Sequence, residues 1–130
     1  MFDLAFERAH RVLLARFYHI MEPTDLQQLD EAMLGFVREH GPVRELIDLT
    51  NVTLIAVPES LLRFRSLFPQ TSPGHTRVTV APQDEIFTWT IAHVAQQHDG
   101  GIVWPYVARS IDEAYQVLGL DSPMFTPLVC

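Results

Sequence analysis

Apolar and polar residues follow two different periods along this chain, and these periods predict an alternation of strands and helices. Phe2, Leu4 and Phe6 alternate with polar residues, as in a strand with one face in water. Residues 12–20 are mostly apolar and predict a second, buried strand. Residues 8–11 suit a turn between them, so we expect the chain to begin with an antiparallel β-hairpin.

A strand buried on both faces is predicted in the middle of the chain, where Leu46-Ile47-Asp48-Leu49 carries a single acid. A run of this kind is typical of a parallel sheet. Thr50 and Asn51 favour a turn directly after it, and Asp48 would cap that turn in a structural role. Binding sites of open α/β sheets lie beyond the carboxyl ends of their strands, so the loop from Asp48 to Ser60 is the first candidate for function.

Helical periodicity and helix-end signals predict four helices. Thr24 or Asp25 caps the first, and Ser110 followed by Glu113 three residues later forms a capping box at the start of the last. Pro58 is favourable in the first turn of the second. The four helices are expected over residues 24–40, 58–68, 82–98 and 111–118.

Two further strands complete the expected sheet, over residues 77–81 and 102–107. Pro105 lacks the N–H that a central strand needs, so the second of these is either an edge strand or bulged. The order ββ-α-β-α-β-α-β-α predicts one α/β domain over residues 1–120. Its sheet is expected to be mostly parallel, with about five strands, the antiparallel N-terminal hairpin and about four helices.

The last ten residues, 121–130, form an expected tail that is too apolar to remain exposed. Met124, Phe125, Leu128 and Val129 lie in it between and after two prolines. We expect this tail either to fold back onto the domain or to pack on a partner.

Composition narrows the class of protein. The chain has 130 residues, of which 48% are hydrophobic and 19% charged, so it can form a core and is not disordered. Its net charge is −7, with nine arginines and no lysine, which argues against a nucleic-acid partner. Cys130 is the single cysteine, so no disulfide within the chain is expected. With no signal peptide and no apolar run long enough for a membrane span, we expect a cytoplasmic protein.

The sequence offers no set of residues typical of catalysis or of cofactor binding. His93 and His98 would lie about 140° apart around a helix of 3.6 residues per turn, which suits no metal ion. No G-x-S-x-G motif surrounds any serine, and Ser110 is better explained as a helix cap. No glycine-rich phosphate loop and no acid–base pair of carboxylates is present. We therefore predict no catalytic residues, no metal site and no cofactor.

With this order of elements and the motif Leu46-Ile47-Asp48-Leu49-Thr50-Asn51-Val52, the chain resembles the STAS superfamily, the fold of bacterial anti-sigma-factor antagonists. The segment is similar to that family's "LDLSGV" strand and turn. Ser110-Ile111-Asp112-Glu113-Ala114 is similar to the start of the family's final helix. The resemblance is greatest to the stand-alone SpoIIAA-like proteins, and it extends more broadly to the fold of the CRAL-TRIO lipid carriers.

The resemblance implies a regulatory module, with one departure. In the antagonists the loop continues to an Asp-Ser pair whose serine is phosphorylated by a partner kinase. Residues 54–58 here read Leu-Ile-Ala-Val-Pro, so the phospho-acceptor is missing and the partner-switch mechanism is not implied. Ser60 lies nearby in a helix start, where a phosphate would meet a favourable dipole.

Our first hypothesis is a non-enzymatic regulatory or protein-binding module. Arginine and aromatic residues are enriched at binding hot spots. At least two of the three apolar residues Leu61, Phe64 and Phe68 are also expected in the core. The expected loop and helix surface consists of Asp48, Thr50, Asn51, Glu59, Ser60, Leu61, Phe64, Arg65 and Phe68. The alternative is a carrier of an apolar, lipid-like molecule held near Phe64, Phe68 and Trp89. A homodimer formed through the tail or the Pro105 strand is a further expectation.

Overall fold

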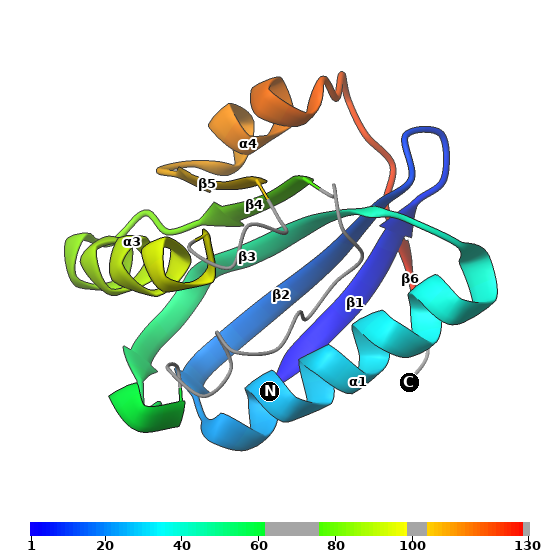
Figure 1. The fold of residues 1–130 in the computed structure, drawn as a ribbon. Helices are drawn as coiled ribbons and strands as arrows, with labels where there is room; N and C mark the ends of the chain where they lie inside the picture. Colours follow the sequence, from blue (N-terminus) through cyan, green and yellow to red (C-terminus); the bar gives the residue numbers. More distant parts are fainter. Residues whose placement is uncertain (62–75, 99–103, 129–130) are drawn as a thin grey trace.

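A mixed sheet of six strands forms the centre of the molecule in the computed structural model, which describes residues 1–61, 76–98 and 104–128 (Figure 1). The strands lie in the order β5-β4-β3-β2-β1-β6. Their bounds are β1 Phe2–Glu7, β2 Val12–Met21, β3 Arg44–Ile55, β4 Thr76–Val80, β5 Trp104–Ala108 and β6 Thr126–Pro127.

Helices lie on both faces of this sheet, but unequally (Figure 1). Two long helices, α1 (Pro23–His40) and α3 (Asp84–His98), lie on one face. The eight-residue helix α4 (Ile111–Leu118) lies on the other. Residues 59–61 are helical as predicted, Pro58 precedes the helix, and residues 62–68 of the predicted helix fall outside the described residues.

The expectation of a mostly parallel sheet with about five strands is wrong. Strands β2, β3, β4 and β5 are parallel to one another, whereas β1 is antiparallel to both of its neighbours, β2 and β6. Strand β6 was not predicted, because a two-residue strand is too short to show a period. It arises where the tail folds back, with the Leu128 N–H donating to the Leu4 carbonyl at 2.9 Å.

The order of the parallel strands explains why the two faces differ. From β2 through β5, each crossover connects a strand to its immediate neighbour, always in the same direction across the sheet. Crossovers are almost always right-handed, so helices in successive crossovers of this kind fall on the same face. The strand order therefore does not reverse within the parallel part of the sheet, from β2 to β5, and such a reversal is where open α/β sheets place their ligands. The opposite face has α4 and the tail as its cover among the described residues.

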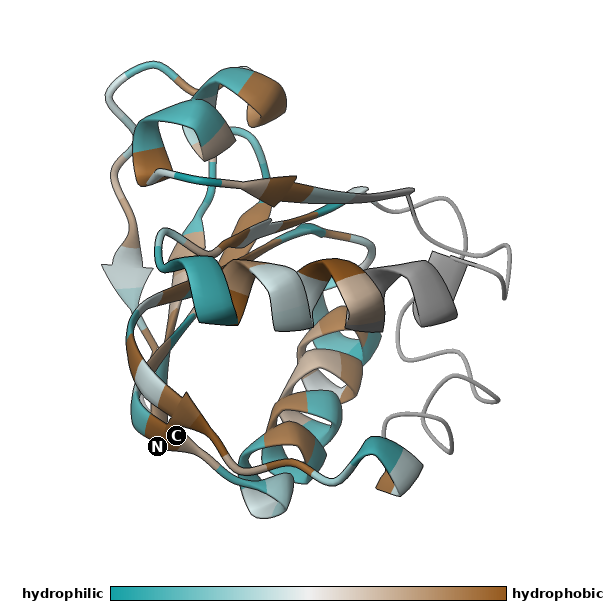
Figure 2. Ribbon diagram, turned by 90° about the vertical axis from the view of Figure 1, so that its left-hand side faces the viewer, coloured by the Kyte–Doolittle hydropathy of each residue, from teal (hydrophilic) through white to brown (hydrophobic). Residues whose placement is uncertain are grey.

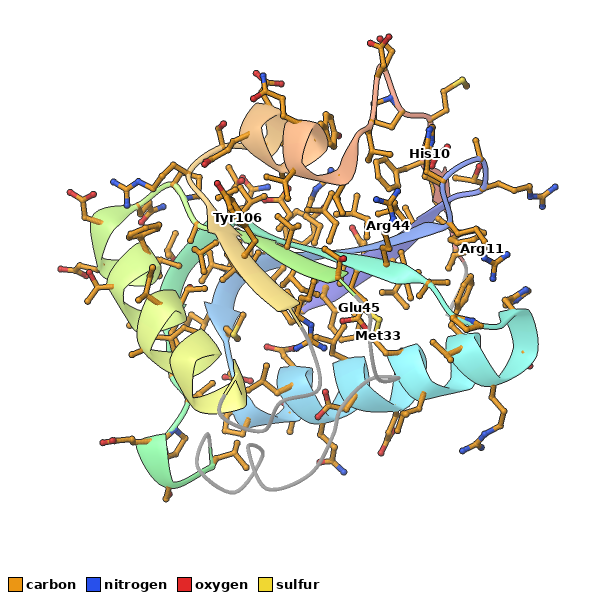
Figure 3. All side chains as sticks on the ribbon, turned by 45° about the horizontal axis from the view of Figure 1, so that its top comes forward. His10, Arg11, Met33, Arg44, Glu45 and Tyr106 are labelled. Carbon is orange, nitrogen blue, oxygen red and sulfur yellow. The ribbon has the colours of Figure 1, made fainter. Side chains whose placement is uncertain are left out.

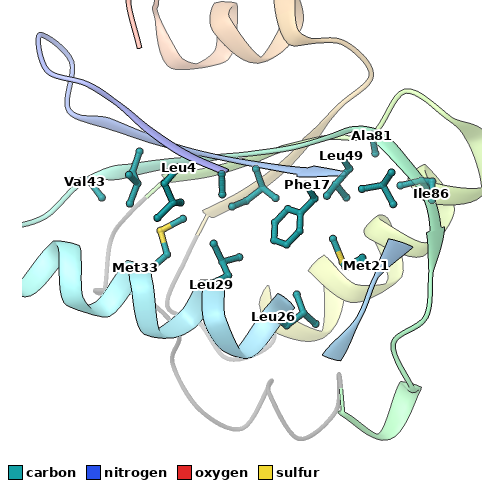
Figure 4. Packing of buried hydrophobic residues seen from close by; sticks show 14 residues of the cluster. Leu4, Phe17, Met21, Leu26, Leu29, Met33, Val43, Leu49, Ala81 and Ile86 are labelled. Carbon is teal, nitrogen blue, oxygen red and sulfur yellow. The ribbon is translucent and has the colours of Figure 1, made fainter. Parts of the chain in front are cut away.

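Two apolar cores follow from this arrangement. The larger lies between the sheet and the long helices, where Phe17 and Met21 pack near Leu29 and Met33 of α1 (Figure 4). Full burial of one such side chain contributes about 2 kcal/mol. The smaller core lies beneath α4 and includes Val12, Leu14, Leu46, Val78, Val80, Ala108, Ala114, Leu118 and Leu120.

The ends of the helices are fixed by local hydrogen bonds. The prediction that Thr24 or Asp25 is the N-cap of α1 is wrong, because the N-cap is Glu22. Asp25 still stabilises this end from inside the first turn, since its Oδ2 accepts the Glu22 N–H at 2.9 Å. Its Oδ1 lies 2.6 Å from the Met1 ammonium. The predicted cap of α4 is confirmed, because the Ser110 hydroxyl accepts the Glu113 N–H at 3.1 Å.

Candidate binding face

Strand β2 is covered along its first half and exposed along its second half on the side that carries α4. Val12 and Leu14 are 0% and 3% exposed beneath the smaller core. Farther along the same side, the Arg16 side chain is 40% exposed and Ile20 is 44% exposed. The cover from α4 and the tail therefore ends near Arg16, midway along the strand.

Strand β3 shows the same change beside it. Leu46 is fully buried and Asp48 is 5% exposed, whereas Leu54 is 54% exposed. The register pairs Arg16 with Asp48, Tyr18 with Asn51 and Ile20 with Leu54. Figure 2 shows that none of the described helices lies over the outer side of β1 and β2 at this end. We call the six residues Arg16, Tyr18, Ile20, Asp48, Asn51 and Leu54 the bare face.

A buried carboxylate and a half-exposed guanidinium mark the border of the bare face. Arg16 Nε donates to Asp48 Oδ2 at 3.2 Å. Asp48 Oδ1 accepts from the Thr50 N–H at 2.9 Å and from the Thr50 hydroxyl at 2.5 Å. Burial acts most strongly, to lower the pKa of Arg16, but hydrogen bonds and electrostatic attraction to Asp48 and Tyr18 together outweigh it and raise that pKa. Arg16 therefore remains a cation that the strand pair holds in place.

The turn predicted at Thr50–Asn51 is not formed, because β3 continues through these residues to Ile55. The pairing of β2 with β3 instead shifts register between Arg16 and Tyr18 and again between His19 and Ile20. Such bulges bend a strand and redirect its side chains. Asp48 does bond the Thr50 N–H, but at the first bulge and not as the cap of the predicted turn.

The second bulge contains a residue with an unusual backbone. His19 has a φ of 61°, a left-handed value that costs a residue with a side chain about 1–2 kcal/mol. Its carbonyl accepts the Thr53 hydroxyl at 3.2 Å, across the strand pair. Backbone of this kind persists where the surrounding structure fixes it, and it is concentrated at functional sites.

Helix α4 borders the bare face through Tyr115. This half-buried residue stacks on Phe125 of the tail, with ring centroids 6.3 Å apart. Burial raises the pKa of the Tyr115 phenol, Asp48 and Asp112 raise it further, and Arg16 lowers it. These effects show that Tyr115 shares its electrostatic surroundings with the Arg16–Asp48 pair.

The structure brings together part of the predicted loop and helix surface. Asp48, Thr50 and Asn51 lie in the bulged part of β3. Glu59 and Ser60 are exposed and Leu61 is half-buried, in a helical turn on the side of α1 and α3 (Figure 1). The predicted residues Phe64, Arg65 and Phe68 lie outside the described residues.

Sequence reasoning missed the β2 half of the bare face. Arg16 and Tyr18 are polar residues two positions apart in a mostly apolar strand. That spacing is a signal for one polar side, but the strand was interpreted as mostly buried. The partner of Arg16 lies 32 residues away in the chain, so nothing local indicates the ion pair.

The other charged clusters serve the fold. Glu45 and Arg77, on β3 and β4, are buried with Oε2 and Nε 2.6 Å apart. Figure 3 shows Glu45 on the side of the sheet that Met33 of α1 faces, away from α4. Within residues 1–61, 76–98 and 104–128, no group of three His, Cys, Asp or Glu side chains could hold a metal ion.

Comparisons with known proteins add no family assignment, because no family model and no curated protein matches the chain. None of the helices in the described part of the chain combines the length and the apolar character needed to cross a bilayer.

Proposed function

We propose that this chain is a non-enzymatic, cytoplasmic protein-binding module with a regulatory role, and that it binds its partner through the bare face. The observation that carries the proposal is the exposed second half of the β2–β3 pair. Sheets made of parallel strands almost always have both faces covered, and β2 to β5 form such a parallel run within this mixed sheet. A parallel pair with one open side is therefore suited to a cover supplied by another protein.

The residues of the bare face are suited to this role. Ile20 and Leu54 lie side by side in register, at 44% and 54% exposure, and supply apolar area to bury. Tyr18 and Arg16 belong to the residue types that are enriched at binding hot spots. The Arg16–Asp48 pair would lie at the polar rim, where a partner replaces water without breaking a buried interaction.

The resemblance to the STAS superfamily is also part of this proposal. It is supported by the order of elements and by a final helix that begins directly after Ser110. The segment that replaces the phospho-acceptor loop, residues 54–58, comprises the end of β3 and the residues that follow it. We therefore propose binding without a phosphorylation switch at that loop.

The carrier hypothesis remains a second proposal, without a described contact that favours it. Trp89 is half-buried and packs against the larger core. The other two residues of the proposed pocket, Phe64 and Phe68, lie outside the described residues.

Affinity capture with matched variants tests the proposal. Tagged wild-type protein, Ile20→Glu and Leu34→Glu would be used to capture partners from cells that make this protein. Leu34 is 46% exposed on α1, away from the bare face. The Leu34→Glu substitution therefore adds the same charge and removes a similar apolar area as Ile20→Glu. We expect one partner to be recovered by the wild type and Leu34→Glu and lost with Ile20→Glu. No partner, or equal recovery by all three proteins, would overturn the proposal.

A further inference from the structure

We infer that the bare face binds a basic amphipathic helix of the partner protein. This inference rests on the proposed function and adds the chemistry and the shape of the segment that would cover the face. Three observations carry it: the charges around the face, the position of the cations elsewhere in the molecule, and the space beside α4.

Acidic residues outnumber cations around the bare face. Asp3 is exposed and lies in register with Arg16 on the side opposite Asp48. Asp112 of α4 is exposed and contributes to the raised pKa of Tyr115, the residue that borders the face. Asp3, Asp48 and Asp112 thus lie around Arg16, which Asp48 already binds, while the Met1 ammonium beside Tyr18 is paired with Asp25. The border of the bare face around Arg16 is thus anionic.

Cations gather at the opposite end of the strands, where they bind backbone carbonyls. Arg11 donates to the carbonyl of His40, the last residue of α1, and to the carbonyl of Pro42, which lies just beyond that helix. Arg44 donates to the Leu118 carbonyl at 2.8 Å, at the end of α4. Figure 3 shows both arginines at the hairpin end with His10. The molecule therefore has a basic hairpin end and an acidic bare end, and such a field steers a basic segment toward the bare face.

The shape of the face favours a helix over an added strand. Helix α4 covers only the first half of its face, and the bare face continues beside it, next to Tyr115. A helix packed there would supply the second covering element that an α/β sheet ordinarily has. Its apolar residues at positions i, i+3 and i+4 would contact Ile20 and Leu54, as in helix-in-groove recognition.

The sheet edges are poor sites for an added strand. The Ala108 carbonyl accepts the Ala81 N–H at 2.9 Å, so it points inward. Because backbone groups alternate along a strand, those of residues 105 and 107 point to the outer edge, where proline has no N–H to donate. At the other edge, β6 is two residues long and contains Pro127. A second copy of this chain is a poor occupant of the bare face as well, because it would bring two acidic faces together.

Synthetic peptides test the inference. A 16-residue peptide of leucine and lysine at helical spacing, about four turns long, would be titrated against the protein by fluorescence anisotropy. A second peptide would carry glutamate in place of lysine. The protein variants would be Ile20→Ala with Leu54→Ala, Asp3→Asn with Asp112→Asn, and the matched control Glu31→Gln with Glu85→Gln, whose glutamates are exposed on α1 and α3. Thermal unfolding would establish that each variant is folded.

We expect the lysine peptide to bind and the glutamate peptide not to bind. Affinity should fall at least about tenfold in the apolar double variant and about fivefold in the Asp3/Asp112 variant. It should stay unchanged in the control. Equal weakening in the control would show general attraction to an acidic protein and overturn the inference. Binding of the glutamate peptide to the same face would overturn the inference and leave the proposed function standing. If neither peptide binds while capture of a partner still depends on Ile20, the inference is overturned and the proposed function stands.

Discussion

At the scale of single residues, Asp48 is where the sheet changes from covered to open. Its carboxylate is buried, bonds Arg16 on β2 and holds the Thr50 N–H at the first bulge. Asp3 lies in register with Arg16 from the other side but is exposed. Asp48 and Asp3 thus share Arg16 as a neighbour but differ in burial and in hydrogen bonding.

Replacing Asp48 by alanine should lower the free energy of unfolding by about 2 kcal/mol, since it removes hydrogen bonds to a charged acceptor and leaves the Thr50 N–H without that partner. The Asp3→Ala substitution should change it by no more than about 0.5 kcal/mol, because the side chain is exposed. Urea denaturation measures both values. A loss for Asp48→Ala no larger than for Asp3→Ala would contradict the structural role of Asp48.

The alkaline limb of stability should depend on Tyr115. Burial raises the pKa of its phenol above the usual 10.0, so the folded protein favours the neutral form. This contribution is complete below the usual pKa and is lost as the pH rises through the folded-state pKa. The free energy of unfolding should therefore fall less between about pH 8 and about pH 11 in Tyr115→Phe than in the wild type. Equal falls in the two proteins would contradict this assignment.

At the scale of elements, the ends of α1 show how a cap can be displaced from its expected position. Glu22 occupies the N-cap, and Asp25 bonds back to it while pairing with the Met1 ammonium. Thr24, the other residue predicted to cap, is exposed. The acid is therefore expected to stabilise this end of the helix and the threonine is not.

The Asp25→Ala substitution should lower the free energy of unfolding by about 1–2 kcal/mol, the usual cost of a lost helix cap. Thr24→Ala should leave it within about 0.5 kcal/mol of the wild-type value. Thermal unfolding followed by circular dichroism compares the two variants. The reverse ranking would show that Asp25 does not support α1.

The sequence predicted most elements because their signals are local. The hairpin, β4 and α4 follow from alternation, apolar runs and a capping box, and the edge position of Pro105 follows from its missing N–H. The end of β3 was not predicted, because Asp48 and Thr50 are typical of a turn when the neighbouring strand is unknown. The bare face was not predicted either, since the side that a strand exposes depends on where the crossovers place the helices.

At the scale of the whole molecule, the structure is asymmetric in cover and in charge. Long helices pack on one face, while the other is open over the carboxyl halves of β2 and β3 (Figures 1 and 2). Arginines bind helix ends at the hairpin, and acids surround the open end. A homodimer remains a prediction, and the proline-bearing edges of the sheet offer it little support.

The central claim is that a partner protein covers the bare face, and photo-crosslinking in cells tests it most directly. A photoreactive amino acid would replace Ile20 in one variant and Leu34 in another, since the two positions are 44% and 46% exposed. We predict a discrete covalent adduct with one partner protein from position 20 and none from position 34. No adduct from position 20, or the same adducts from both positions, would contradict the claim.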